Sequence, residues 1–368
     1  MKILHLISSG GFFGAEQVLL SLGKALQQQG NDVVVGALND LRDPHLEIVE
    51  QAQKAGIETV TFDSRGRIDF KTIATLRKYL KENNIEVLHT HNYKSNLVGM
   101  LAAKASRTVL VATVHGYTDM TKAVSFYEKV DRFVINNFFD RVVGVARSVF
   151  GKNLRPCQVV VPNGLDVDAF HKDPEARNQI RSKYAIQEND FLVGTVGRLS
   201  PEKNQKLLLQ AIKDIAREKK NVRVMIVGSG SQEQLLKDFV RTEGLDSHVI
   251  FTGFIEDLAA YYNAMDLFVL PSNTEGIPMT LLEAMACQCP VVATSVGGVP
   301  GILKNGKAGR LVKPQNLNEL KQSIVDLINS HDERQHSGKE GSVFVAENYS
   351  LSRMDGAYKE IYNEVLKK

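Results

Sequence analysis

The segment LFVLPSNTEGIPMTLLEAMACQCPVVAT, residues 267–294, alternates two secondary-structure patterns. Its apolar run Leu267–Leu270 predicts a buried strand, and Val291–Ala293 predicts a second one. Between them Met279–Ala286 predicts a helix, whose first turn is prepared by Pro278. Strands that are apolar throughout and joined by a helix are typical of a parallel sheet covered on both faces.

The same alternation of strand and helix runs through both halves of the chain. In the N-terminal half the predicted strands are Lys2–Ile7, Asp32–Leu38, Gly56–Phe62, Glu86–His89, Thr108–Val114, Arg141–Val145 and Gln158–Val161. In the C-terminal half, besides the two strands above, they are Phe191–Val196, Val222–Val227, Val249–Phe251 and Arg310–Val312. We therefore expect the α/β fold class, with two Rossmann-like, doubly wound parallel-sheet domains.

A polar stretch separates the two alternations and predicts where the first domain ends. We expect an N-terminal Rossmann-like domain at 1–165, an interdomain connection at 166–190 and a C-terminal domain at 191–348. The tail, 349–368, predicts an amphipathic helix that returns to the N-terminal domain. Ligands of open α/β sheets bind at the carboxyl ends of the strands, so we expect a central cleft that both sheets face.

Composition narrows the class of protein. The 368 residues are 43% hydrophobic and 24% charged, which is ordinary for globular domains. A net charge of +3 is too small to favour nucleic acid as a partner. The three cysteines form neither a metal-binding spacing nor a disulfide framework and fit a reducing cytosol. No apolar run approaches the roughly 18 residues of a membrane span, so we expect a cytoplasmic protein.

Two glutamates flank the start of the helix predicted after Pro278. Glu275 precedes that start, and Glu283 lies a little more than one turn inside the helix. The free N–H groups and the positive dipole end of a helix N-terminus suit a diphosphate. The two carboxylates could then contact a sugar and a ribose. The spacing alone is equally consistent with a capping acid and a solvent-exposed helix acid.

The stretch VGTVGRLSPEKN, residues 193–204, brings two cations to a loop that enters a helix. Arg198 and Lys203 could hold a pyrophosphate and neutralise a leaving group without a metal ion. The G-x-x-x-x-G-K-[ST] spacing of a Walker A loop is absent. Taken alone, the two cations are as consistent with surface charges.

Glycines and histidines follow several predicted strands. Gly10, Gly11 and Gly14 follow the first strand, and GSG at 228–230 follows a later one, but neither has the dinucleotide spacing G-x-G-x-x-G. His115 ends a strand, where a structural histidine is commoner than a catalytic one. The pair at 89 and 91 suggests a metal, yet no carboxylate or cysteine completes a site. The D-x-D pattern at 166–168 is interpreted as a loop feature.

Together and in this order, these stretches resemble the group 1, or family 4, retaining glycosyltransferases, which have the GT-B fold. The resemblance covers essentially the whole chain. It rests on the glycine loop at 10–14, HGY at 115–117, VPNGLD at 161–166, GRLSPEKN at 197–204, GSG at 228–230, FTGF at 251–254 and EGIPMTLLEAMACQCPVVAT at 275–294. The last motif is the most specific, because its two glutamates are eight positions apart.

The resemblance implies a role for each matching residue. Arg198 and Lys203 would contact the donor diphosphate, while Glu275 would bind the donor sugar. His115 would lie near the sugar hydroxyls, and these four are the expected catalytic residues. Glu283 would bind the ribose. The remaining expected donor-binding residues are Gly10, Gly11, Gly14, Gly228, Phe254, Ile255, Gly276, Ile277, Pro278, Met279 and Thr280, of which Phe254 and Ile255 would line the base pocket. The family implies neither a metal nor a cofactor.

The same resemblance implies a mechanism and a donor. The anomeric carbon would react through an oxocarbenium-like state, and an oxygen of the departing phosphate would take the acceptor proton. UDP-sugars are favoured as donors because they are commoner in this family, and GDP-sugars are the alternative. The acceptor would be a lipid-linked or saccharide molecule of bacterial cell-envelope polysaccharide, lipopolysaccharide or glycolipid synthesis.

The segment 122–141, KAVSFYEKVDRFVINNFFDR, predicts an amphipathic helix with basic flanks. Such a helix suits the surface of an anionic membrane and would make the protein peripheral on its inner face. A helix packed on its own domain is the alternative.

Two other functions compete with that of a transferase, namely a nucleotide-sugar 2-epimerase and a non-catalytic nucleotide-binding GT-B scaffold. A dehydrogenase is disfavoured because the dinucleotide fingerprint is missing.

Overall fold

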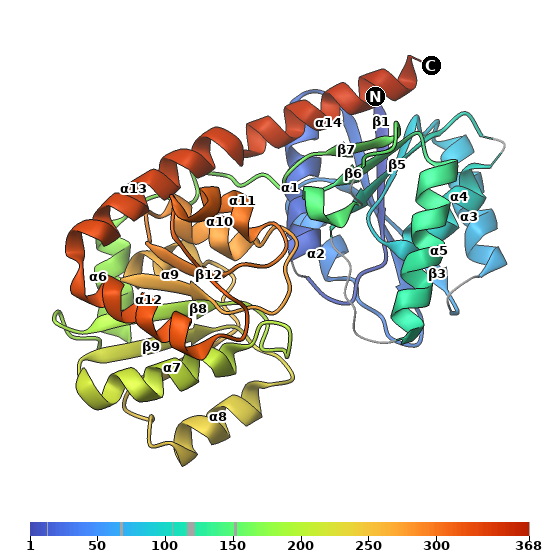
Figure 1. The fold of residues 1–368 in the computed structure, drawn as a ribbon. Helices are drawn as coiled ribbons and strands as arrows, with labels where there is room; N and C mark the ends of the chain where they lie inside the picture. Colours follow the sequence, from blue (N-terminus) through green and yellow to red (C-terminus); the bar gives the residue numbers. More distant parts are fainter. Residues whose placement is uncertain (13, 67–68, 105, 116–121, 151–152, 368) are drawn as a thin grey trace. The chain divides into compact units, whose positions relative to one another are not determined.

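The computed structural model describes the whole chain except residues 13, 67–68, 105, 116–121, 151–152 and 368, and the side chains of 122–127 and 148 (Figure 1). It divides into two compact units. Unit 1 comprises residues 1–164 and 351–368, and unit 2 comprises residues 165–350. The C-terminal helix therefore belongs to the same unit as the N-terminal residues.

Unit 1 is built on a seven-stranded parallel sheet with the strand order β3-β2-β1-β4-β5-β6-β7. Its strands are β1 (Lys2–Ile7), β2 (Asp32–Asp40), β3 (Glu58–Ser64), β4 (Val87–Thr90), β5 (Val109–Val114), β6 (Arg141–Gly144) and β7 (Gln158–Val160). Its helices are α1 (Gly14–Gln28), α2 (Glu47–Lys54), α3 (Phe70–Glu82), α4 (Tyr93–Ala103), α5 (Lys122–Phe138) and α14 (Leu351–Leu366), with a short 3₁₀ turn at Arg147–Val149.

Buried aliphatic strands and polar caps explain these elements. Leu4 and Leu6 of β1 are fully buried, as expected for a central strand of a sheet covered on both faces. Helix α4 begins at a capping box, in which the Asn92 side chain accepts from Ser95 N. The cap of α3 is Asp69, whose carboxylate accepts from Lys71 N. These caps fix where the helices that cover the sheet begin.

Unit 2 contains a six-stranded parallel sheet with the order β10-β9-β8-β11-β12-β13. Its strands are β8 (Phe191–Val196), β9 (Val222–Val227), β10 (Val249–Gly253), β11 (Leu267–Leu270), β12 (Val291–Thr294) and β13 (Arg310–Val312). Its helices are α6 (Pro174–Lys183), α7 (Gln205–Glu218), α8 (Glu233–Thr242), α9 (Ala259–Ala264), α10 (Met279–Ala286), α11 (Val299–Ile302), α12 (Leu317–Asn329) and α13 (His331–Asn348), with a 3₁₀ turn at Lys304–Gly306. The predicted α/β class with two doubly wound parallel sheets is confirmed.

Helix α6 lies in the stretch that the sequence predicts as a connection, and it is anchored within unit 2. Arg177 and Arg181 of this helix form ion pairs with Asp266, at 2.6 and 3.1 Å. The same carboxylate accepts a hydrogen bond of 2.8 Å from Leu192 N, near the start of strand β8. Because Arg181 is buried, this arrangement holds α6 against the strands. Among the described residues, no helix is long and apolar enough to cross a membrane.

Candidate functional site

Three loops meet at the carboxyl end of the unit 2 sheet. Backbone hydrogen bonds join the loop after β8 to the loop after β9, from Gly197 N to Val227 O (3.0 Å) and from Leu199 N to Ser229 O (2.9 Å). The loop after β11 is tied to the first of these through Asn273 N, which donates to Glu202 O at 2.8 Å. These bonds hold the motifs GRLSPEKN and GSG beside the start of EGIPMT.

Two glycines, one in the loop after β9 and one in the loop after β12, are required by close backbone approach. Gly228 has φ +130°, and a Cβ placed there would overlap the carbonyl oxygen of Gly197. Gly297 has φ +53°, and a Cβ there would overlap the carbonyl oxygen of Glu275. Gly228 therefore has a structural role whether or not it also contacts a ligand.

Lys203 and Glu275 meet at this edge of the sheet. The Nζ atom of Lys203 lies 2.7 Å from Oε1 of Glu275, which also accepts a hydrogen bond of 2.6 Å from Ser272 Oγ. The side chain of Glu275 is 7% exposed and that of Lys203 is 23% exposed. A carboxylate so enclosed is held by the lysine charge and the hydroxyl. No pattern in the sequence pointed to Ser272.

Arg198 has a different partner. Its guanidinium lies 2.6 Å from Glu202, and its side chain is 49% exposed. The pair Arg198–Glu202 thus joins two residues four positions apart on the loop, and because the arginine is exposed the pair contributes little to stability. Arg198 nevertheless stands on the same loop as Lys203, so both cations belong to this edge of the sheet.

The N-terminus of α10 begins four residues after Glu275 of the ion pair. Its N-cap is Pro278, which provides no side-chain capping bond. The hydroxyl oxygen of Thr280, in the first turn, is buried and has no hydrogen-bond partner within the described residues. Ile277 and Pro278 are buried, and Gly276 O accepts a bond from Gly298 N at 2.9 Å. A helix start of this kind suits an anionic ligand.

Glu283 is buried within α10. Its side chain accepts a hydrogen bond of 2.6 Å from the Tyr262 hydroxyl, and the residue is 5% exposed. Burial raises the pKa of Glu283 to about 7, against the opposing effect of the Tyr262 hydrogen bond. Its burial excludes the interpretation as a solvent-exposed helix acid. The tyrosine partner, 21 positions away, was not foreseeable from the motif.

Phe254 and Ile255 follow β10 at the same end of the sheet. Phe254 is 66% exposed and Ile255 is half-buried. Gly253, which precedes them, has φ +73° and accepts a hydrogen bond of 2.8 Å from Gly228 N. This backbone bond ties the end of β10, which precedes Phe254 and Ile255, to the glycine loop after β9. An exposed aromatic ring at the carboxyl end of a parallel sheet is suited to a planar ligand such as a base.

In unit 1 the loop after β1 carries the predicted glycines. Gly11 is buried with φ +133°, which favours glycine, and Gly14 is the first residue of α1. A Cβ at Gly10 or Gly14 would meet no atom within 4 Å, so the fold itself does not require glycine at either position. The loop is fastened by Ser9 Oγ, which donates to the buried carboxylate of Glu16 at 2.9 Å.

Four histidines gather at the carboxyl end of the unit 1 sheet. His115 Nε2 lies 3.3 Å from His91 Nδ1, and His91 Nε2 lies 3.0 Å from His5 Nδ1. Burial lowers the pKa of His115 to about 4 and that of His5 to about 3. His5, unlike the others, was missed in the sequence, because a single histidine inside a strand gives no periodic signal. The residues Gly116 and Tyr117 of HGY lie outside the described part of the chain.

Three of these rings, those of His5, His89 and His91, have ligand atoms within 4.8 Å of one another and could hold a metal ion. Both ring nitrogens of His89 already have partners, however. Its Nδ1 lies 2.6 Å from the Tyr362 hydroxyl and its Nε2 lies 2.7 Å from the Thr113 hydroxyl. A metal at this place would break one of these short hydrogen bonds.

The D-x-D pattern forms a turn, in which Asp168 N donates to the Asp166 carboxylate at 3.2 Å.

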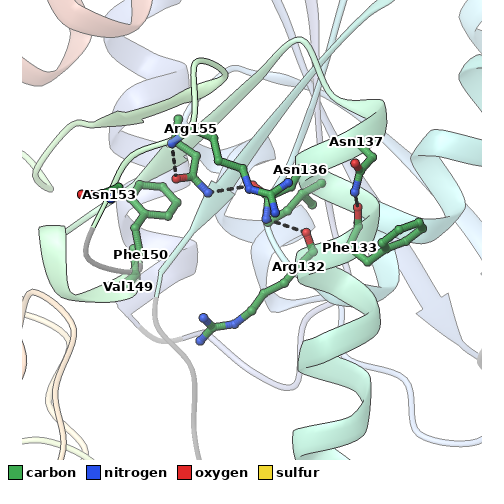
Figure 2. Close-up of a pocket in the computed structure, with 10 residues that line it drawn as sticks. Arg132, Phe133, Asn136, Asn137, Val149, Phe150, Asn153 and Arg155 are labelled. Carbon is green, nitrogen blue, oxygen red and sulfur yellow. Dashed lines mark hydrogen bonds between the residues drawn. The ribbon is translucent and has the colours of Figure 1, made fainter.

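A separate hollow of unit 1, about 410 Å³ in volume, lies beside α5 (Figure 2). Arg132, Phe133 and Asn136 of α5 line one side, and Phe150 and Arg155 line the other. A hydrogen bond of 2.7 Å from Gln158 Nε2 to Asn136 Oδ1 joins the two sides. None of the residues predicted for the donor site lines this hollow.

Comparison with known families decides the class. Residues 13–169 match the description Glycosyltransferase Family 4, and residues 176–343 match Glycosyl transferases group 1. The chain belongs to these glycosyltransferases. The family is one of retaining enzymes that use nucleotide-sugar donors, so the predicted resemblance is confirmed.

Individual relatives and solved structures agree with this family. GDP-mannose-dependent alpha-(1-6)-phosphatidylinositol monomannoside mannosyltransferase of Mycolicibacterium smegmatis is 30% identical over 295 residues, 76% of this chain and 77% of that protein. UDP-Gal:alpha-D-GlcNAc-diphosphoundecaprenol alpha-1,3-galactosyltransferase of Escherichia coli is 28% identical over 279 residues, 72% and 71% of the two chains. Anabaena HepE in complex with UDP-glucose has a TM-score of 0.87 at 23% identity, covering 99% of this chain and 100% of that one. The structural likeness confirms the GT-B fold.

Replacing Glu283 tests the burial of its carboxyl group in this glycosyltransferase. Because the folded-state pKa is raised from 4.5 to about 7, the group's stabilising contribution is complete below pH 4.5 and is lost as the pH rises through 7. Glu283→Gln cannot ionise, so its stability relative to the wild type should increase between pH 5 and pH 8, by up to about 3 kcal/mol. Thermal unfolding across this pH range measures the difference.

The exposed acid Glu218 of α7 provides the control for Glu283. The difference between Glu218→Gln and the wild type should stay nearly constant over the same range. A constant difference for Glu283→Gln as well would contradict the assignment of a buried carboxyl group that titrates near neutral pH.

Proposed function

We propose that this glycosyltransferase moves a hexosyl group from a nucleotide-diphosphate sugar, with retention, to a lipid-linked or saccharide acceptor. The acceptor would belong to cell-envelope polysaccharide, lipopolysaccharide or glycolipid synthesis in bacteria. The observation that carries the proposal is the Lys203–Glu275 ion pair of 2.7 Å beside the uncapped N-terminus of α10. A cation, an enclosed carboxylate and free backbone N–H groups are the chemical complement of a sugar diphosphate.

Each of these groups would act on a different part of the donor. Lys203, Arg198 and the N-terminus of α10 would bind the diphosphate and stabilise its charge as it departs. Glu275 would accept hydrogen bonds from the sugar, and Glu283 from the ribose. These protein cations would neutralise the leaving group without a metal or other cofactor.

The acceptor proton needs no strong base of the protein. An oxygen of the departing phosphate lies on the face from which the acceptor would attack in a retaining reaction, and it can take the proton. The pKa of His115 is lowered to about 4 by burial, so this ring is neutral near pH 7. His115 would contact the sugar hydroxyls as a neutral hydrogen-bonding group.

For the base we propose uracil, with guanine as the alternative. Anabaena HepE was solved with UDP and UDP-glucose, and the Escherichia coli relative is named for UDP-Gal. The mycobacterial relative is named for GDP-mannose and favours guanine. Phe254 and Ile255 would form the surface on which either base lies.

We propose further that α5 touches an anionic membrane surface from the cytoplasmic side. Val134 and Ile135 are buried against unit 1, which accounts for one face of the helix. On its other side Phe133 is 63% exposed and Phe138 is 53% exposed, with ring centroids 6.2 Å apart. Arg132 lies next to Phe133 and is also exposed. Exposed aromatic rings beside a cation suit the interface of an anionic membrane, where a lipid-linked acceptor would lie.

Thermal stabilisation by nucleotides tests the donor site. With EDTA present throughout, UDP or GDP at a hundredfold excess over its Kd should stabilise the protein by about 2.7 kcal/mol. Lys203→Ala should abolish most of this shift, because it removes the lysine charge that would bind the diphosphate. UDP, GDP, ADP, their sugars and NAD are compared by differential scanning fluorimetry.

Lys213 of α7 is a matched control for Lys203, since it forms an ion pair of 2.6 Å with Glu243 in the same unit. Lys213→Ala should keep the full nucleotide shift. A thermal shift with NAD alone, or no shift with any of the nucleotides, would contradict the proposal of a transferase. Nucleotide binding with no turnover of any tested sugar donor would favour the non-catalytic scaffold, and interconversion of the free donor would favour the 2-epimerase.

Sedimentation with lipid vesicles tests the membrane contact. The protein should bind phosphatidylglycerol vesicles and not phosphatidylcholine vesicles, and Phe133→Ser with Phe138→Ser should reduce binding by at least about tenfold. Phe70→Ser is the control, because Phe70 of α3 is an exposed phenylalanine of the same unit. Equal loss in the control, or no binding to anionic vesicles, would contradict the contact.

A further inference from the structure

A chain of three histidines ends at His115. His5 lies in β1 and is in register with His89 of the neighbouring strand β4, and His91 follows β4 by one residue. The ring of His91 is stacked near that of His115, with centroids 5.5 Å apart and an interplanar angle of 26°. The strand order places β1, β4 and β5 side by side, so His5 inside β1 and the residues that follow β4 and β5, His91 and His115, form one row.

Ring nitrogens face one another along this row. The pair His5 Nδ1 and His91 Nε2 is 3.0 Å apart, and the pair His91 Nδ1 and His115 Nε2 is 3.3 Å apart. At the two ends, His5 Nε2 and His115 Nδ1 are buried and have no hydrogen-bond partner among the described residues. His91 is therefore the central link, with a histidine at each of its two nitrogens.

All three rings are neutral near pH 7. Burial is the main cause in each case, because it holds the pKa of His5, His91 and His115 below the ordinary value of 6.5. A neutral imidazole has one N–H donor and one bare acceptor nitrogen. Once the proton of His91 is placed, the protons of the other two rings follow, and the row has only two settings.

In the first setting every ring carries its proton on Nδ1. His5 then donates to His91, His91 donates to His115, and His115 presents an Nδ1–H at the end of β5. In the second setting every proton is on Nε2, the bonds run the other way, and His5 is left with an N–H that has no acceptor.

The burial of the two ends decides between these settings. His5 is 0% exposed, so an N–H at its Nε2 would be an orphaned buried donor, which is rarer and more costly than an orphaned acceptor. His115 as a residue is half-buried, and its buried Nδ1 atom lies at the carboxyl edge of the sheet, the edge at which ligands of parallel sheets bind. The first setting puts the unused donor where a ligand can satisfy it.

We propose that His91, oriented by His5, holds His115 as the Nδ1–H tautomer, so that His115 is a fixed hydrogen-bond donor to an oxygen of the bound sugar. His5 and His91 are positioning residues that act through His115. The assignment of the sugar as acceptor rests on the proposed function, whereas the tautomer does not. His115 in this form has no basic nitrogen to present to a substrate, which agrees with a reaction that uses the leaving phosphate as base.

The branch through His89 steadies the row. Its two nitrogens lie within hydrogen-bond distance of Tyr362 and Thr113, and Thr113 Oγ1 lies 2.8 Å from the Tyr358 hydroxyl. The rings of His89 and His91 have centroids 4.3 Å apart. Helix α14 thus packs two buried tyrosines, Tyr358 and Tyr362, against the His89 side of the histidine cluster.

Nitrogen-15 NMR of the full chain labelled in histidine tests the tautomers directly, because bare and protonated ring nitrogens have well-separated shifts. His115, His91 and His5 should each show a protonated Nδ1 and a bare Nε2, with signals identified by their loss in His115→Gln, His91→Asn and His5→Gln. A protonated Nε2 on His115, a mixture of tautomers or an imidazolium at pH 7 would overturn the proposal. So would displacement of the His5 and His91 signals by Zn²⁺ or EDTA, because a metal would take the nitrogens that form the row.

Two variants of His91 separate tautomer control from mere packing. The amide of His91→Asn can still donate to His115 Nε2 and should preserve the single tautomer, whereas His91→Leu should release it. His91→Leu should weaken the binding of a nucleotide sugar by about two- to tenfold, relative to its effect on the binding of the bare nucleoside diphosphate. This is the range expected for one lost hydrogen bond. Equal effects of the two variants on the His115 signals would contradict the proposal. Absence of any nucleotide binding would refute the donor site and leave the NMR result to decide the tautomer.

Discussion

The Lys203–Glu275 ion pair depends on how closely three loops approach one another at the carboxyl end of the unit 2 sheet. Backbone hydrogen bonds join the loops after β8, β9 and β11, and glycines at 228 and 297 let carbonyl oxygens lie where a side chain would overlap them. This close approach brings a lysine from the loop after β8 to a glutamate 72 positions later. The chemistry of the site is thus a consequence of backbone packing between loops that follow adjacent strands.

The two units use opposite electrostatic means. In unit 2, one lysine and one carboxylate are paired while partly enclosed, and the pairing keeps the lysine charge in place for an anionic ligand. In unit 1, burial keeps the histidines neutral, so that hydrogen-bond direction rather than charge is what they supply. A retaining transfer needs both, since the departing diphosphate requires positive charge whereas the sugar hydroxyls require oriented donors and acceptors.

The sequence predicted strands and helices well where one physical signal dominates. Helix α10 has its predicted bounds, Met279–Ala286, because proline and an apolar run mark both ends. What remained unpredictable depends on long-range contacts. The partner of Glu283 is a tyrosine from α9, and the chain His5–His91–His115 is drawn from three neighbouring strands. A local pattern carries no information about which distant side chain completes such a contact.

The central claim is that a sugar nucleotide binds at the loop edge of the unit 2 sheet. A crystal structure of the protein soaked with UDP-glucose, and in parallel with GDP-mannose, tests it most directly. The account predicts the diphosphate within hydrogen-bond distance of Lys203 and the backbone N–H groups at the start of α10, with the base against Phe254 and Ile255. A nucleotide bound elsewhere, with the Lys203–Glu275 pair untouched and no phosphate at α10, would contradict it.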